Sequence, residues 1–195
     1  MDGRLIIRNQ RIETSEKIVS INPATLETIG EACLASEKEA NQAIEAAKKA
    51  FPLWSSFSFK ERGKIFEKAK QVLLKRSEEI AHLISSEQGR PIAEALVTEV
   101  FPCLDNLNYY AKYTEKLLKN EIVKYHQALF RNKKGYFRFE PMGISLVISP
   151  WNYPFLIPFV EVLAALAAGN TVILRPSSTT PFIGLSIGEI FQEAG

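Results

Sequence analysis

The chain has 195 residues, of which 46% are hydrophobic and 24% are charged. These are ordinary globular values, and they exclude a wholly disordered chain and a fibrous repeat. The formal net charge of +2 is too balanced to indicate a nucleic-acid partner or an anionic membrane surface. Two cysteines cannot build a disulfide framework, and no Cys/His spacing suits a metal, so we expect a metal-free, reduced, cytoplasmic protein.

No targeting or membrane segment is expected. Residues 1–12 carry charges without an apolar stretch, unlike a signal peptide. Residues 141–160 are free of charge over the length of a membrane span, but they contain three prolines after Gly143, which would break a spanning helix.

Charge is unevenly distributed along the chain. Residues 1–140 hold 23 Lys/Arg and 19 Asp/Glu, whereas residues 141–188 hold only Glu161 and Arg175. Such a fall is typical of a parallel sheet that helices cover on both faces. We therefore expect three parts: residues 1–121 with N-terminal strands and helices, a bridging hairpin at 122–141, and the start of a Rossmann-like sheet at 142–195.

The first part is predicted as short strands followed by helices. Residues 5–7 and 18–21 favour strands. Two capping boxes, Ser36 with Glu39 and Ser58 with Glu61, predict the starts of two amphipathic helices. A third helix is expected over 78–88, ending at Gly89. A fourth should follow Pro91 and carry apolar residues as far as Leu117, with a kink or break at Pro102.

Residues 122–140 predict a long, twisted hairpin with strand-like runs at 122–123, 128–130 and 136–139 and a turn at 132–135. Eight basic residues lie between positions 112 and 138. They indicate either an anion-binding patch or, as we favour, a solvated helix end and a hairpin whose edges lysines protect.

From Gly143 onward, strands and helices alternate. Buried strands are predicted at 144–149 and 171–174, and apolar helices at 155–168, closed by Gly169, and at 182–194. This order predicts the first βαβα units of a doubly wound parallel sheet in an α/β protein.

The candidate chemistry lies in the loops after these two strands, where ligands bind in open α/β sheets. Prolines stiffen the first loop around Asn152, whose amide could serve as an oxyanion donor or, equally, as a helix N-cap. In the second loop, Arg175 with Ser177 and Ser178 could face a phosphate or ribose. Alternatively, Arg175 pairs with Glu161 or ends the strand in solvent. The usual glycine-rich phosphate fingerprints are absent.

Four stretches in order resemble the aldehyde dehydrogenase superfamily. They are residues 22–25 (Asn-Pro-Ala-Thr), 87–91 (Glu-Gln-Gly-Arg-Pro), 140–155 around Ser-Pro-Trp-Asn-Tyr-Pro, and 164–177 ending in Ile-Leu-Arg-Pro-Ser. The resemblance extends from about residue 18 to the end of the chain, and the order of the landmarks is more specific than any one of them.

The resemblance implies an NAD(P)-dependent enzyme that oxidises an aldehyde to a carboxylic acid through a cysteine thiolate and a glutamate general base. It implies that Asn152 donates its amide to the developing oxyanion. Cofactor contacts are implied for the following residues: Ile148, Ser149, Pro150, Trp151, Asn152, Arg175, Pro176, Ser177 and Ser178. It also implies a homo-oligomer that assembles through the 122–141 hairpin.

Two departures from the family concern the cofactor. Its usual lysine is Arg175 here, and the glutamate that binds the ribose and repels a 2′-phosphate is Ser178. A lost carboxylate beside an arginine should admit NADP at least as well as NAD.

A third departure concerns length. The family's nucleophilic cysteine and general-base glutamate are expected beyond the end of this sequence, so we predict that the 195-residue chain alone is inactive. Cys33 and Cys103 match no nucleophile, and neither His82 nor His126 has a partner at catalytic spacing. The alternatives are a non-catalytic remnant that serves assembly, or a relative that reduces acyl phosphates or acyl-CoA.

Overall fold

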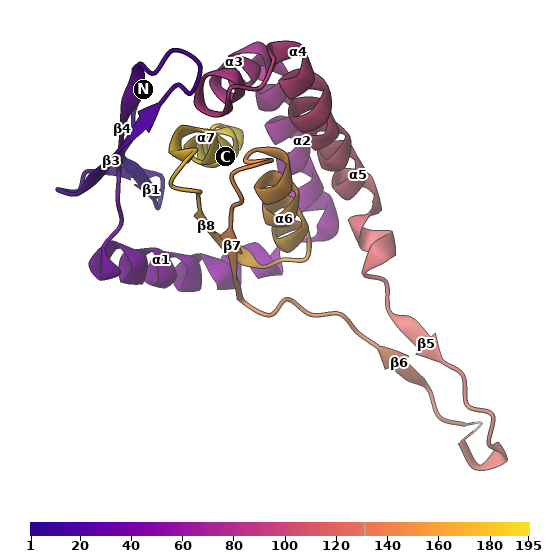
Figure 1. Cartoon of the computed structure of the whole chain (residues 1–195). Coiled ribbons are helices and arrows are strands. Elements are labelled where there is room, and N and C mark those ends of the chain that lie inside the picture. The colour runs from indigo at the N-terminus through magenta and orange to yellow at the C-terminus, as the bar shows by residue number, and fades with distance from the viewer. Residues whose placement is uncertain (131) are drawn as a thin grey trace.

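The structure is a computed structural model that describes residues 1–130 and 132–195. Four short strands come first, in two antiparallel pairs: β1 (Leu5–Ile7) with β2 (Gln10–Ile12), and β3 (Lys17–Ile21) with β4 (Thr28–Cys33). Figure 1 shows these strands on the left-hand side of the body.

The helices of the first part follow in the predicted order: α1 (Glu37–Ser56), α2 (Phe59–Lys75), α3 (Ser77–Gln88), α4 (Ile92–Ala95), a π-helical turn (Leu96–Val100) and α5 (Phe101–Leu117). Both predicted capping boxes are present: Ser36 and Ser58 each cap a helix, and Glu39 and Glu61 return to the capping backbone. Gly89 ends α3 in the left-handed conformation, as expected of a glycine stop. Pro102 lies in the first turn of α5, directly after the π turn, and the backbone before it stays helical, so the predicted kink or break appears as a change of helix type and not as an interruption.

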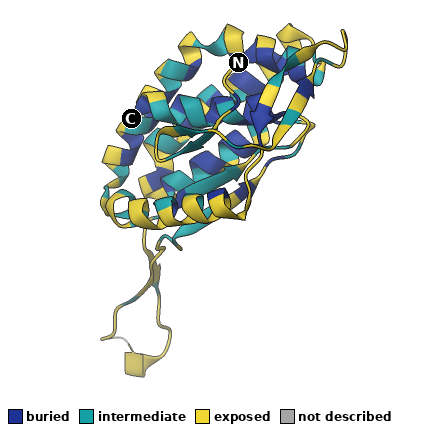
Figure 2. Ribbon diagram, turned by 90° about the vertical axis from the view of Figure 1, so that its left-hand side faces the viewer, coloured by how far each residue is buried: buried dark blue, intermediate teal, exposed yellow. Residues whose placement is uncertain are grey.

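A hairpin projects from the body (Figure 1). It pairs β5 (Glu121–Val123) with β6 (Gly135–Phe137) in antiparallel register over three residues. The strand predicted at Ala128–Phe130 is wrong, because these residues form a 3₁₀ turn near the hairpin tip. Arg131, one of the basic residues of this segment, lies outside the described residues. Figure 2 shows that the hairpin is almost wholly exposed.

The last part is a parallel β–α–β–α unit: β7 (Ile144–Ile148), α6 (Leu156–Ala167), β8 (Thr171–Arg175) and α7 (Pro181–Ala194). Helix α1 packs on β7 and β8, as does α6, while α7 packs on α2 and α3. Two hydrogen bonds tie α1 to this unit: Trp54 Nε1 donates to Leu166 O at 3.1 Å, and Thr171 Oγ1 donates to Ala47 O at 3.1 Å.

The predicted burial of the first parallel strand is wrong in part. Within β7, Val147 is buried, but Leu146 and Ile148 are 61% and 59% exposed. Side chains alternate across a strand, so the side of β7 that carries Val147 is covered, whereas the side that carries Leu146 and Ile148 is open. The core lies instead between the helices, where Phe66, Phe155 and Phe159 are almost completely buried. Among the described residues, no helix is long and apolar enough to cross a membrane.

Candidate functional site

The parallel pairing of β7 and β8 brings the two predicted loops together. Ile148 is paired with Arg175 in the strand register, and the Ser149 N–H donates to the Arg175 carbonyl at 2.9 Å. The chain therefore leaves both strands at the same carboxyl edge, where ligands bind in open α/β sheets.

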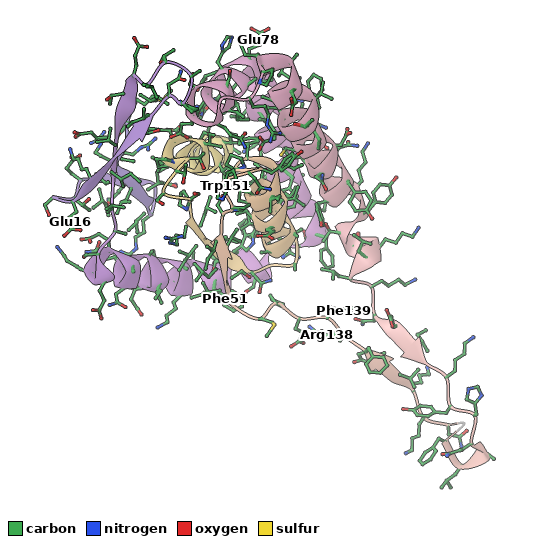
Figure 3. The ribbon with its side chains drawn as sticks, in the orientation of Figure 1. Glu16, Phe51, Glu78, Arg138, Phe139 and Trp151 are labelled. Atoms are coloured by element: carbon green, nitrogen blue, oxygen red, sulfur yellow. The ribbon has the colours of Figure 1, made fainter. Side chains whose placement is uncertain are left out.

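The first loop, residues 149–155, has one buried end and an exposed middle. Ser149 is buried, and its hydroxyl donates to Pro150 O at 3.2 Å. Trp151, labelled in Figure 3, is 63% exposed, and Asn152 beside it is exposed too. The N-cap alternative for Asn152 is wrong, because α6 begins at Leu156 and its N-cap residue is Phe155.

The end of α3 holds the backbone of this loop. Gln88 Nε2 donates to the carbonyls of Trp151 and Asn152, at 3.3 and 2.5 Å. Arg90 Nη2 donates to the same Asn152 carbonyl at 2.8 Å, and its guanidinium lies 4.3 Å from the Tyr153 ring centroid. Among the described residues, Asn152 contributes only this carbonyl to hydrogen bonds, which leaves its side-chain amide unengaged.

A buried carboxylate holds the other end of the loop. Glu99 lies in the π turn with no exposed surface, and it accepts the backbone N–H groups of Phe155 at 2.9 Å and Leu156 at 3.2 Å. It replaces the side-chain cap that α6 lacks. Burial raises the pKa of the Glu99 carboxyl above its usual range, although these N–H donors and Arg90, 3.4 Å from Oε1, act in the opposite direction.

The second loop, residues 176–180, presents small polar side chains. Arg175 and Ser178 are exposed and Ser177 is half-buried, its hydroxyl accepting the Thr179 N–H at 3.3 Å. Within the described residues Arg175 forms no ion pair with Glu161 or any other carboxylate, so the ion-pair alternative is wrong and the exposed guanidinium is free to face a ligand.

Close packing fixes this loop against α7. A Cβ added at Gly184 would lie 2.4 Å from Cβ of Pro176. Glu87, at the end of α3, accepts the N–H groups of Phe182 and Ile183, at 3.0 and 2.8 Å. Glu87 thus binds the start of α7 as Glu99 binds the start of α6. In both cases a carboxylate from the helical region accepts backbone N–H groups at the start of a helix of the parallel unit.

Among the described residues, no cysteine or histidine hydrogen-bonds to the two loops of this edge. Both cysteines are buried and free. Burial raises the pKa of the Cys103 thiol well above its usual range, which disfavours the nucleophilic thiolate. His82 and His126 are exposed. No cluster of His, Cys, Asp and Glu in the described part of the chain could hold a metal ion.

Two surface hollows lie elsewhere: one at the hairpin tip beside Tyr125 and Phe130, and one beside the N-terminus, lined by Asp2 and Glu31 among others. The exposed groups at the carboxyl edge of β7 and β8 are a guanidinium, a hydroxyl and an amide, a donor set that suits a phosphate or a ribose. The residues present thus fit a nucleotide cofactor by their chemistry.

Sequence reasoning did not identify the supports of the first loop. From the sequence, Gln88 and Arg90 are only part of a family landmark, and Glu99 is not predicted to have a role. One signal was available: an acidic residue in the apolar stretch around Leu96 and Val100 requires a buried partner.

Comparisons with known proteins agree on one family. The model of the aldehyde dehydrogenase family matches residues 11–195. 1-Pyrroline-5-carboxylate dehydrogenase 2 of Bacillus subtilis is 36% identical over the whole chain, which covers 37% of that protein. A betaine aldehyde dehydrogenase of Vibrio vulnificus is 38% identical over 94% of the chain and is likewise covered over 37% of its length.

Solved structures share the fold. An E. coli structure described as an NADP-dependent enzyme superposes with a TM-score of 0.91 at 29% identity, over 99% of this chain and 40% of that one. The structure of PnpE in complex with nicotinamide adenine dinucleotide superposes with a TM-score of 0.91 at 28% identity, over 100% and 39% of the two chains. The chain therefore spans less than half the length of these relatives.

Proposed function

Because the chain belongs to the aldehyde dehydrogenase family, we propose that it forms the N-terminal part of an NAD(P)-dependent enzyme that oxidises an aldehyde to a carboxylic acid. The observation that supports this most directly is the edge shared by β7 and β8. There, the exposed Asn152 and the exposed Arg175 and Ser178 come from adjacent loops. Residues 148–152 and 175–178 would hold the cofactor, which accepts a hydride when bound.

Asn152 is the residue of this chain proposed to act on the reacting atoms. An amide donor fixed where negative charge develops stabilises an oxyanion, and removing such a donor costs about 10²–10³ in kcat. The unengaged side-chain amide on an anchored backbone supports this role. We further propose that the nucleophile and the general base are not among these 195 residues, since both cysteines are buried. The chain alone would then be inactive.

We propose that the cofactor site accepts NADP at least as well as NAD. The exposed Arg175 supplies a cation, and Ser178 places a hydroxyl where a carboxylate would repel a 2′-phosphate. One neighbour being described as NADP-dependent is consistent with this preference. We propose no narrower substrate class than an aldehyde, because the relatives are named for two different substrates.

The projecting hairpin supports an assembly role. Ile122, Leu129 and Phe137 are 81%, 83% and 66% exposed, and exposed apolar side chains in such number favour association. We propose that residues 122–141 join copies of the protein. The alternative, a non-catalytic assembly module, would keep this contact without binding a cofactor.

The test is a titration of the purified chain with NADP and NAD, followed by tryptophan fluorescence. We expect NADP to bind at least as tightly as NAD, Arg175→Ala to weaken NADP, and Ser178→Glu to favour NAD. Arg4→Ala, a change at a distant exposed ion pair, is the control. Far tighter binding of NAD would contradict the cofactor proposal, and association without binding of either would favour the assembly module.

The intact mass of the protein in its source decides between these functions. A mass more than twice the 21.9 kDa of this chain would support a complete enzyme. A mass near 21.9 kDa would leave cofactor binding and assembly as the only functions to test.

A further inference from the structure

We propose that Arg90, assisted by Gln88, is a positioning residue that fixes Asn152 for its role at the oxyanion. This inference rests on the function proposed for Asn152. Neither Arg90 nor Gln88 is placed on the reacting atoms; both act through the backbone of the loop.

The contacts of Arg90 make it the central support of this loop. Its side chain is only 10% exposed and reaches five groups. Nη2 donates to Asn152 O at 2.8 Å, and Nη1 donates to Thr98 Oγ1 at 2.7 Å and lies 3.4 Å from Glu99 Oε1. Nε lies 3.9 Å from Glu94 Oε1, and the guanidinium covers the Tyr153 ring. A planar guanidinium with donors in fixed directions can serve all of these at once, which the single ammonium of a lysine cannot.

Arg90 and Glu99 hold the loop from both ends. Arg90 binds the carbonyl of Asn152, and Glu99 binds the N–H groups of Phe155 and Leu156. Because these two side chains also pair with each other, the chain from 152 to 156 is tied to one buried ion pair. The Cα of Asn152 is thereby fixed, and only its two side-chain torsions remain to be set.

The local backbone explains how Arg90 and Glu99 come to lie together. Gly89 turns the chain with a φ of +77°, and Pro91 restricts the conformation of Arg90. The π turn Leu96–Val100 then carries Glu99 to the buried side of the helix. Such π turns within helices occur frequently at functional sites, which is a second observation in favour of the assignment.

The test is a double-mutant cycle between Arg90→Met and Asn152→Ala. The cycle uses the protein as it occurs in its source. If that protein ends at Gly195, the downstream part of the Bacillus subtilis relative is fused after Gly195. Misplacing a catalytic group by about 1 Å can cost about 100-fold, so we expect Arg90→Met to lower kcat about 10- to 100-fold with little change in KM. In the Asn152→Ala background the same change should have almost no further effect.

Two further variants keep the test decisive if Arg90→Met folds poorly. Gln88→Met removes the other donor to the loop and should show the same loss of additivity, while Arg90→Lys should recover part of the kcat. Arg4→Met is the matched control at an exposed arginine. In the protein without cofactor or substrate, hydrogen exchange of the Phe155 and Leu156 amides, which donate to Glu99, should rise in Arg90→Met and not in the control.

The outcomes separate this inference from the proposed function. If Asn152→Ala leaves kcat unchanged in a folded protein, the role of Asn152 is wrong. If Asn152→Ala lowers kcat but the losses from Arg90→Met or Gln88→Met simply multiply with it, or if amide exchange in the loop is unchanged, the positioning role is wrong and the proposed function stands.

Discussion

Replacing Glu87 with alanine should expose how strongly α7 depends on a distant carboxylate. Glu87 accepts three hydrogen bonds: from Ser20 Oγ at 2.8 Å, Phe182 N at 3.0 Å and Ile183 N at 2.8 Å. The variant leaves three buried donors without an acceptor, each costing about 1–3 kcal/mol. Relief of the carboxylate's own burial, which raises its pKa, offsets part of this loss. We expect a net destabilisation of about 3 kcal/mol, the lower end of the cost of breaking a buried charged contact.

Urea unfolding followed by circular dichroism measures this difference. With a slope of about 2 kcal/mol per molar urea, about 3 kcal/mol moves the midpoint by about 1.5 M. Glu78→Ala is the control, because Glu78 is an exposed carboxylate in the first turn of the same helix, and it should cost less than about 1 kcal/mol. Equal midpoints for the two variants would refute the reasoning that Glu87 caps α7.

Three further predictions concern buried groups. The folded state holds a proton on Glu87 more tightly than the unfolded state, because burial raises its pKa. The wild type should therefore lose unfolding free energy relative to Glu87→Gln as pH rises through this raised pKa. A difference between the two proteins that stays constant from pH 4 to pH 8 would contradict this. Cys103 is fully buried with a raised pKa, so a thiol reagent should modify it only after urea unfolding; rapid labelling of the native chain at this residue would count against its burial. Gly184→Ala should lower the unfolding free energy by about 1–3 kcal/mol, because the new Cβ would meet Pro176 at 2.4 Å. Thermal unfolding measures this loss. The control is Gly188→Ala, whose Cβ would meet only the flexible end of the Ile6 side chain at 3.1 Å.

Local signals made most of the fold predictable. The capping boxes at Ser36 and Ser58 and the stop at Gly89 are set by residues within one helical turn, so the sequence specifies them directly. The alternation of strands and helices after Gly143 can also be recognised locally, and it predicted the parallel pairing of β7 and β8. The segment 128–130 was wrong because its β-favouring composition does not decide the conformation of an exposed hairpin tip, where three apolar residues form a 3₁₀ turn.

The partners of the residues that support the candidate site were beyond sequence reasoning. Glu99 binds backbone groups 56 residues away and Glu87 binds one 95 residues away, and no spacing rule connects such positions. The loops after β7 and β8 were predictable as a pair because strand order alone places them at one edge. Their anchoring depends on how the helical region packs on that edge, which is a property of the tertiary structure.

The two capping glutamates also determine how this edge can treat an anion. A helix N-terminus normally attracts a phosphate through its free N–H groups and the positive end of its dipole. In α6 and α7, N–H groups of the first turn already donate to Glu99 and Glu87, whose carboxylates occupy the place that a phosphate would take. A glycine-rich phosphate loop would therefore have no function at these two helices. The attraction for negative charge that we propose at this edge then depends on Arg175, an exposed cation that solvent ions can screen, so we expect nucleotide affinity there to weaken with rising salt.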